Sequence, residues 1–484
     1  MSINIACPVL LKVELKLPSG GAGWDSTPNL AAPTRDLAFV TRVWKAIVGG
    51  TLKAGFVREV WVRSGIPKQC HGSFAVAVDS DYGGRPGAWA GIWVLDFRFR
   101  GVIMAACATG RERLEPGLTN PMKLAIRNSV FCLWLIGASL LPGADFSKDW
   151  ARMKDIVPQG YVCHRTTGPI TVDRRLEEPD WQRAAWTRDF ADIEGDAKPK
   201  PRFRTRAKML WDDQYFYVGA ELEEPHVWGT LTQHDSVIFR DNDFEVFIDP
   251  NGDSHEYYEF EMNALNTGWD LLLKKPYKDG GPALNEWEIP GLKTAVHIVG
   301  TINNPADKDK GWWVEIAFPW QALASYAHRH TPPQEGDQWR VDFSRVEWQI
   351  NIVNGKYEKV PNTREDNWIW SPPGIVDMHR PEKWGYVQFT KRTGEVAFVP
   401  DPSMPARNVL QGIYYAQRDY ETKNHHWART LGDLNLSADL GPGLVKAPTM
   451  KLTSNGFEAS ADVKLPNGRM QHWHIRQDAL IRPD

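Results

Sequence analysis

Apolar and polar residues alternate in short runs from about residue 168 onward, and turn-forming residues separate the runs. This pattern is typical of β-strands that bury one face and expose the other. Helical periodicity is scarce in the same region. We therefore expect an all-β fold, a β-sandwich of two facing sheets. The predicted strands are 204–211, 215–220, 244–248, 257–263, 269–273, 294–302, 312–318, 339–348 and 384–389.

The alternation also assigns the faces of two central strands. Phe244, Val246 and Ile248 should point to one side, and Glu245 to the other. In the next strand the apolar residues alternate with Glu259, Glu261 and Asn263. Each strand is thus predicted to have one apolar face for the core and one carboxylate-rich face for solvent or a ligand.

The region after the sandwich, residues 398–484, changes in pattern. Residues 398–405 contain three prolines and predict a linker, and residues 406–423 have helical spacing. Residues 450–481 predict a short antiparallel pair with a turn at 465–468. We therefore expect a small α+β tail. Its segment 414–420 faintly resembles the conserved helix of pilin-like proteins, and packing of the tail on the sandwich is the alternative.

Residues 122–144 have the three parts of a secretory signal peptide: a basic start at 122–127, an apolar run at 130–141 and a small-residue exit at 142–144. The run is too short to span a bilayer comfortably, since a transmembrane helix needs about 20 residues. We expect Met122 to be the true start of the protein. Residues 1–121 would then be a non-native or disordered, poorly ordered extension. The mature protein is expected to be secreted or periplasmic, with no membrane span. The alternative is a genuine N-terminal domain followed by a buried apolar helix.

Charge and composition narrow the possible partners. The residues after 144 comprise 41 basic and 51 acidic side chains, a balance that argues against a nucleic-acid partner. The same region holds 17 of the 23 Trp residues, far more than an ordinary core requires. Only Cys163 remains after the predicted cleavage point, so no internal disulfide is expected.

Five ordered motifs between residues 165 and 390 resemble the family 9 carbohydrate-binding-module-like domain, a DOMON-related, jelly-roll-like antiparallel sandwich. They are 170–181, which resembles the opening segment with Arg174 in place of the usual Gly, 208–218, 243–250 (DFEVFIDP), 311–317 and 339–345. The resemblance implies a non-catalytic domain that binds saccharides.

The resemblance also implies site residues. Members of this family hold the reducing end of a sugar between two Trp rings, assisted by a Glu, an Arg and an Asn. Glu245 matches the Glu and Asn263 the Asn, whereas Glu261 stands at the Arg position. One clamp Trp falls near Phe239 and the other near Met378.

Aromatic rings beside polar groups suit sugars, because sugar C–H faces stack on rings while hydroxyls seek carboxylates and amides. Trp269 and Trp370 are predicted platforms, and ordinary packing in the core is the alternative for each. Further candidates at predicted loops or strand ends are Trp228, Trp287 and Trp368.

The stretch after the strand 244–248 places oxygen ligands at Asp249, Asn251 and Asp253, which resembles the start of a calcium loop. Family members carry structural calcium, so a calcium ion is predicted here. An Asx-rich turn is the alternative.

We expect an exported carbohydrate-binding protein that supports carbohydrate catabolism. Haem binding is one alternative, because related DOMON domains hold haem between Met and His, and Met378 precedes His379. A glycoside hydrolase is another, because Glu245, Glu259 and Glu261 share a predicted face. His472 and His474 also alternate on one strand and suggest a metal, with an exposed polar tail as the alternative.

Overall fold

The computed structural model describes residues 145–436 and 443–484, together with the backbone of five strands in the first 100 residues. These five strands are β1 (Ser2–Ile5), β2 (Leu11–Lys16), β3 (Val57–Gly65), β4 (Cys70–Val78) and β5 (Ile92–Phe99), which pair in the order β1-β2-β5-β4-β3. The predicted signal peptide at 122–144 and the rest of residues 1–121 lie outside the described residues. The true start of the chain therefore stays a prediction.

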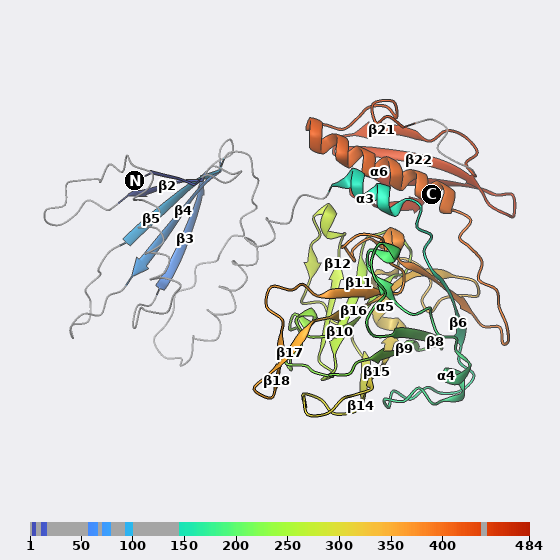
Figure 1. Cartoon of the computed structure of the whole chain (residues 1–484). Coiled ribbons are helices and arrows are strands. Elements are labelled where there is room, and N and C mark those ends of the chain that lie inside the picture. The colour runs from blue at the N-terminus through green and yellow to red at the C-terminus, as the bar shows by residue number, and fades with distance from the viewer. Residues whose placement is uncertain are drawn as a thin grey trace, which may run out of the picture. The chain divides into compact units, whose positions relative to one another are not determined.

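The sandwich is one long curled sheet (Figure 1). Its strands follow the order β13-β12-β11-β10-β16-β20-β6-β8-β9-β15-β14, and β19 and β7 extend it beside β16. Their bounds are β6 (Gly160–Arg165), β7 (Ala191–Asp192), β8 (Thr205–Trp211), β9 (Tyr215–Glu223), β10 (Asp243–Asp249), β11 (Tyr257–Asn263), β12 (Gly268–Leu273), β13 (Ala283–Leu284), β14 (Lys293–Val299), β15 (Gly311–Pro319), β16 (Gln338–Glu347), β19 (Asp366–Ile369) and β20 (Gly385–Thr390).

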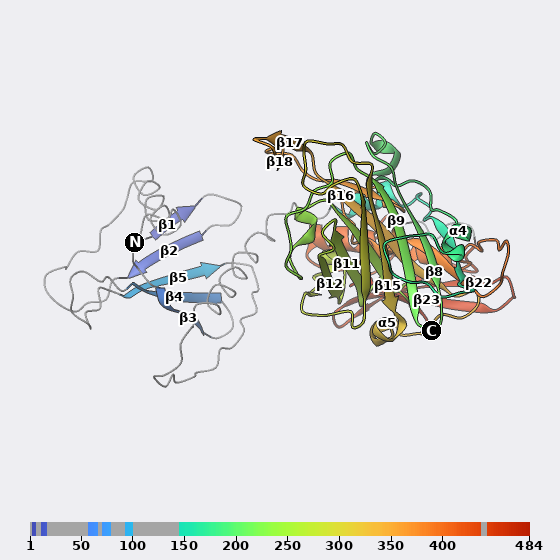
Figure 2. The ribbon, with the colours of Figure 1, turned by 90° about the horizontal axis from the view of Figure 1, so that it is seen from below.

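Pairing in this sheet is antiparallel except at β6, which runs parallel to both β20 and β8. Figure 2 shows β8, β9 and β15 side by side, in keeping with their pairing. The main core joins apolar side chains from both groups of strands, among them Val218, Ile316, Phe244 and Phe343. The predicted all-β sandwich is confirmed, and so is the inward direction of Phe244, Val246 and Ile248.

Short helices and one small hairpin lie in the connections between the strands of the sandwich. The helices are α4 (Pro179–Arg183), α5 (Trp320–Ala327), η2 (Gly195–Ala197), η3 (Ile238–Arg240), η4 (Tyr277–Asp279) and η5 (Pro381–Lys383), and the hairpin is β17 (Ile350–Val353) with β18 (Lys356–Lys359). η3 carries Phe239 and lies beside β11, where the Phe239 N–H donates to Glu261 Oε2 at 3.0 Å.

The tail has its own core, formed by α3 (Phe146–Met153), α6 (Met404–Asn424) and a four-stranded antiparallel sheet. The sheet consists of β21 (Thr449–Thr453), β22 (Gly456–Lys464), β23 (Met470–Arg476) and β24 (Ile481–Pro483). The sequence predicted only two antiparallel strands here, whereas the structure has four. The predicted helix is confirmed as α6.

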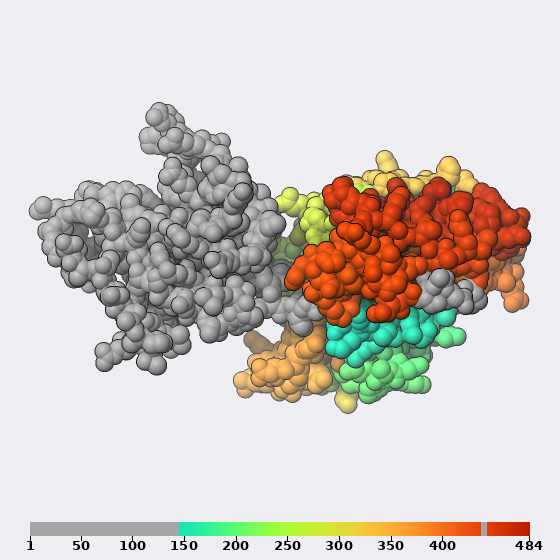
Figure 3. All heavy atoms as spheres, turned by 90° about the horizontal axis from the view of Figure 1, so that it is seen from above, coloured from blue at the N-terminus to red at the C-terminus, as the bar shows by residue number. Residues whose placement is uncertain are grey.

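The tail packs on the sandwich, as Figure 3 shows from the side of the tail. Arg407 donates to the Gly252 carbonyl at 2.5 Å, and the Ile481 N–H donates to the Asp253 carbonyl at 3.1 Å. Within residues 145–436 and 443–484, none of the helices is both long and apolar enough to cross a bilayer.

Candidate functional site

The side of β10 and β11 that faces away from the main core carries a row of carboxylates. Antiparallel pairing sets Glu245 opposite Glu261, and Glu259 opposite Phe247. Asp243, Glu245 and Glu261 each offer an oxygen, and these oxygens lie within 4.8 Å of one another. We call Asp243, Glu245, Glu259 and Glu261 the acidic row.

The acidic row is buried, with Glu245 the most exposed member at 6%. Burial raises the pKa of Glu245 to about 7, and the charge of Glu365 adds to this effect. Burial, together with the charge of Glu245, raises the pKa values of Asp243, Glu259 and Glu261 well above their ordinary range. The row therefore holds protons near neutral pH, and its members can both donate and accept hydrogen bonds.

Aromatic side chains border one end of the acidic row. The rings of Phe239 and Trp269 lie 6.4 Å apart at an angle of 35°. The indole N–H of Trp348 donates to the Phe239 carbonyl at 2.9 Å, and the Lys359 ammonium lies 3.5 Å from the centroid of the Trp348 ring. Phe239 and Trp269 are half-buried, so each keeps part of its ring open to solvent. This arrangement can offer a sugar apolar faces, a cation and carboxyl groups together.

The other end of the same face is apolar. Phe247, Tyr257 and Trp384 pack there, and Trp269 and Met378 pack against the same cluster. Met378 and Trp269 thus lie on the same side of the sheet, and the role of Met378 in binding stays a prediction. Next to it, His379 Nδ1 is hydrogen-bonded to the Tyr257 hydroxyl at 2.9 Å, and burial lowers the pKa of His379 to about 4.

Two predicted ligand-binding residues have structural roles instead. Trp370 is 3% exposed and packs in the main core, with its ring 5.7 Å from that of Phe343 and close against Gly385. Asn263 is fully buried, and its amide makes four hydrogen bonds: it accepts from the N–H groups of Leu265 and Thr267, which closes its own loop, and it donates to Leu231 and Asp241 of a more distant segment. The prediction of a ring platform at Trp370 is wrong, because the strand end that carries Trp370 turns into the core.

The other Trp candidates lie mostly inside the protein. Trp228 and Trp368 are 5% and 3% exposed, and the half-buried Trp287 packs on Tyr258. Sequence reasoning missed Trp348 and Lys359 as site residues. The available signal was the position of Trp348 at the end of the strand predicted for 339–348.

The predicted calcium residues form a closed turn. Asp249 accepts from the N–H groups of Gly252 and Ser254 at 2.8 and 2.9 Å. Asn251 Oδ1 accepts from the Asp253 N–H at 3.2 Å, and Asp253 accepts from His255 at 2.8 Å. These bonds are typical of Asx turns. Calcium at Asp249, Asn251 and Asp253 stays a prediction, which a melting temperature lowered by a calcium chelator would support.

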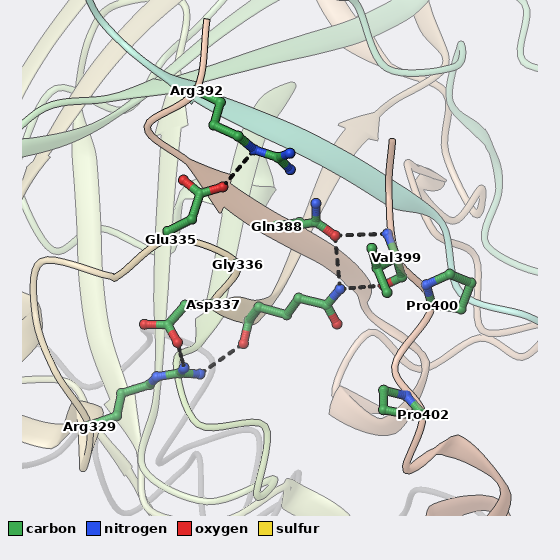
Figure 4. A pocket seen from close by; sticks show the side chains of 10 residues that line it. Arg329, Glu335, Gly336, Asp337, Gln388, Arg392, Val399, Pro400 and Pro402 are labelled. Atoms are coloured by element: carbon green, nitrogen blue, oxygen red, sulfur yellow. Dashed lines mark hydrogen bonds and ion pairs between the residues drawn. The ribbon is translucent and has the colours of Figure 1, made fainter. Parts of the chain in front are cut away.

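A cavity of about 730 Å³ lies elsewhere, between residues 329–338, Gln388, Arg392 and the linker (Figure 4). Its charged side chains neutralise one another: Arg329 pairs with Asp337 at 2.8 Å and Arg392 with Glu335 at 3.0 Å. The aromatic and acidic face is therefore the stronger candidate site.

The fold and this face define a β-sandwich of a ligand-binding type. Residues 172–391 match the family described as "Carbohydrate family 9 binding domain-like", so this segment is a family 9 carbohydrate-binding-like domain.

Curated relatives resemble the chain over a short segment. They include the exoglucanase XynX of Acetivibrio thermocellus, 27% identical over 117 residues, and the endo-1,4-beta-xylanase A of Thermoanaerobacterium saccharolyticum, 27% identical over 116 residues. Each match covers 24% of this chain but only 9% and 8%, respectively, of these much longer relatives.

Two solved structures are similar at 14% identity. A family 9 carbohydrate-binding module from Caldicellulosiruptor kristjanssonii in complex with cellotriose has a TM-score of 0.33, covering 50% of this chain and 99% of that one. A putative carbohydrate-binding protein from Bacteroides uniformis has a TM-score of 0.36, covering 48% and 100%.

Proposed function

We propose that the chain is an exported carbohydrate-binding protein whose family 9 domain binds a saccharide at the face formed by the acidic row, Phe239, Trp269 and Trp348. The observation that carries the proposal is the half-buried ring pair Phe239 and Trp269 directly beside paired carboxyl groups. Rings and carboxyl groups together match the two sides of a sugar, which has apolar C–H faces and hydroxyls at its edge.

The chemistry of the face favours a neutral sugar with several free hydroxyls. Protonated carboxyl groups donate and ionised ones accept, so the row can pair with hydroxyls in either role. Glu261 stands where the family pattern has Arg, which removes a positive charge from the face. A sugar acid would therefore be disfavoured, since it would bring a further negative charge beside buried carboxyl groups.

The relatives suggest which sugars to test. The names of the matched relatives are those of an exoglucanase and xylanases. We therefore infer a β-linked glucan or xylan fragment as the ligand and support of polysaccharide breakdown as the role. Export rests on the signal-peptide pattern of residues 122–144, and the mass of the mature native protein is its test.

Calorimetry of the full chain with cellotriose and xylotriose tests the binding. Trp269→Ala and Glu245→Gln should weaken binding at least about tenfold if the ring and the carboxyl group contact the sugar. Trp313→Ala is the matched control, because Trp313 is a half-buried ring on β15 whose neighbour is His297. Absence of binding to both sugars and to soluble xylan, or equal loss in the Trp313 variant, would overturn the proposal.

The two alternative functions, haem binding and glycoside hydrolysis, can each be tested directly. Haem ligation by His379 would compete with its hydrogen bond to Tyr257 and with ring contacts to Phe247 and Tyr277. A Soret band after addition of haem would reveal it. Hydrolysis by Glu245, Glu259 or Glu261 would release reducing sugar from xylan, and an assay of reducing ends detects that directly.

A further inference from the structure

A second cluster of polar side chains lies at the edge of the sheet, on the opposite side of β12 from Trp269. His234 reaches it from the loop that follows β9, Asp270 from β12, and Glu288 from the loop before β14. His234 Nε2 lies 3.0 Å from Glu288 Oε2, 3.3 Å from Asp235 Oδ1 and 3.5 Å from Asp270 Oδ1. Segments far apart in sequence thus place one imidazole nitrogen among three carboxylates.

The orientation of the His234 ring is fixed by its other nitrogen. Nδ1 lies 3.0 Å from the carbonyl oxygen of Gly268, which can only accept, so Nδ1 carries a proton and donates it. The same carbonyl accepts the Asp235 N–H at 3.1 Å. A histidine whose one N–H donates to a backbone carbonyl presents the second nitrogen outward, which is the usual arrangement of a metal-binding histidine.

The environment of Asp270 is independent evidence for a ligand at this cluster. It is 2% exposed, and its Oδ2 accepts the Ile289 N–H. Its Oδ1 is buried and has no hydrogen-bond partner in the part of the chain that the structure describes, yet it is the oxygen aimed at His234 Nε2. A buried carboxylate oxygen without a partner is costly, so a ligand at this point would relieve a real penalty.

We propose that His234, Asp235, Asp270 and Glu288 bind a divalent transition-metal ion of the zinc class. The ligand atoms of His234, Asp235 and Asp270 lie within 4.8 Å of one another. In a tetrahedral site with bonds of about 2.0–2.1 Å, neighbouring ligand atoms are about 3.3–3.4 Å apart. The distances from Nε2, 3.0 to 3.5 Å, bracket that value.

The types of ligand atom indicate which metal ion the site would bind. Calcium takes six to eight oxygens, whereas imidazole with carboxylates suits zinc and its neighbours. The ion would tie the loop at 234–235, which leads into η3 and Phe239, to the strand that carries Trp269. That the ion would influence sugar binding at Phe239 and Trp269 rests on the proposed function. The binding of the metal itself does not.

Calorimetric titration of the full chain with ZnCl₂ after removal of metals tests the site. We expect zinc to bind and to raise the melting temperature, and we expect any binding of CaCl₂, at the predicted Asp249 turn, to be unchanged by His234→Gln. His234→Gln and Glu288→Gln should each weaken this binding at least about tenfold. His297→Gln is the matched control, because His297 is an exposed histidine on β14 that contacts the ring of Trp313.

Asp270→Asn distinguishes metal binding from loss of folding. Its side-chain oxygen can still accept the Ile289 N–H, so the metal-free variant should melt no lower than the original protein while its zinc affinity falls. The proposal is overturned if the original protein binds no zinc, or if His234→Gln and His297→Gln bind it equally. Sugar binding measured in the same samples is a separate readout, so failure of one proposal is distinguishable from failure of the other.

Discussion

Replacement of Glu245 by Gln should stabilise the protein, although it removes a side chain of the proposed site. Gln has nearly the shape of a protonated Glu and never ionises. Glu245 is 6% exposed, and burial raises its pKa from 4.5 to about 7. This difference corresponds to a penalty of about 3 kcal/mol for ionising Glu245 in the folded protein.

The sign of the effect follows from proton binding. Below pH 4.5, Glu245 is protonated in both the folded and the unfolded chain, so the penalty is absent. Between pH 4.5 and about 7 only the folded chain keeps the proton, and stability falls as pH rises. Above pH 7 the penalty is complete. The Gln variant escapes it and should be about 3 kcal/mol more stable there.

Thermal unfolding followed by circular dichroism at pH 4.5 and pH 8 measures the difference. At pH 8 the melting temperature of Glu245→Gln should rise by roughly 6–12 °C for a domain of this size, and at pH 4.5 the two proteins should melt together. Glu286→Gln, at an exposed position, is the control. An equal change at both pH values, or a loss of stability at pH 8, would refute the argument that burial holds the proton on Glu245.

Three further predictions concern packing in the sandwich. Trp370→Ala should lower the free energy of unfolding in urea by about 3–5 kcal/mol, while Trp269→Ala should lower it far less and act mainly on sugar affinity. Arg345→Leu should destabilise by about 3–5 kcal/mol, because it removes the buried cation that pairs with both Glu224 and Glu347; unchanged urea midpoints would contradict this. Gly311→Ala should prevent normal folding, since φ is +143° and a Cβ would lie 2.1 Å from the Leu222 carbonyl oxygen; a soluble variant with the original melting temperature would disprove it.

Local pattern was enough to predict much of the fold. The alternation at Phe244, Val246 and Ile248 predicted a strand and its buried face, because successive side chains of any strand point to opposite sides. The helical spacing after residue 405 predicted α6, because residues three or four positions apart lie on the same face of any helix. The motifs around Glu245 then indicated the family.

Pairing between distant segments was beyond the reach of the sequence. The parallel insertion of β6 between β20 and β8 depends on a segment near residue 160 meeting one near residue 387. The burial of Trp370, and the use of the Asn263 amide to close its own loop, depend on what packs above each residue.

The sequence by itself determined nine strands of the sandwich, the apolar side of β10 and the family that the segment from 172 to 391 matches, but it did not predict β6, β7, β13 or β19. Only the tertiary structure decided which aromatic rings stay open, which carboxyl groups share protons, and that Asp270 and Glu288 both lie within 3.5 Å of His234 Nε2. The physical reason is that side-chain direction along a strand repeats locally, whereas burial, pKa and ligand geometry depend on neighbours that distant parts of the chain supply.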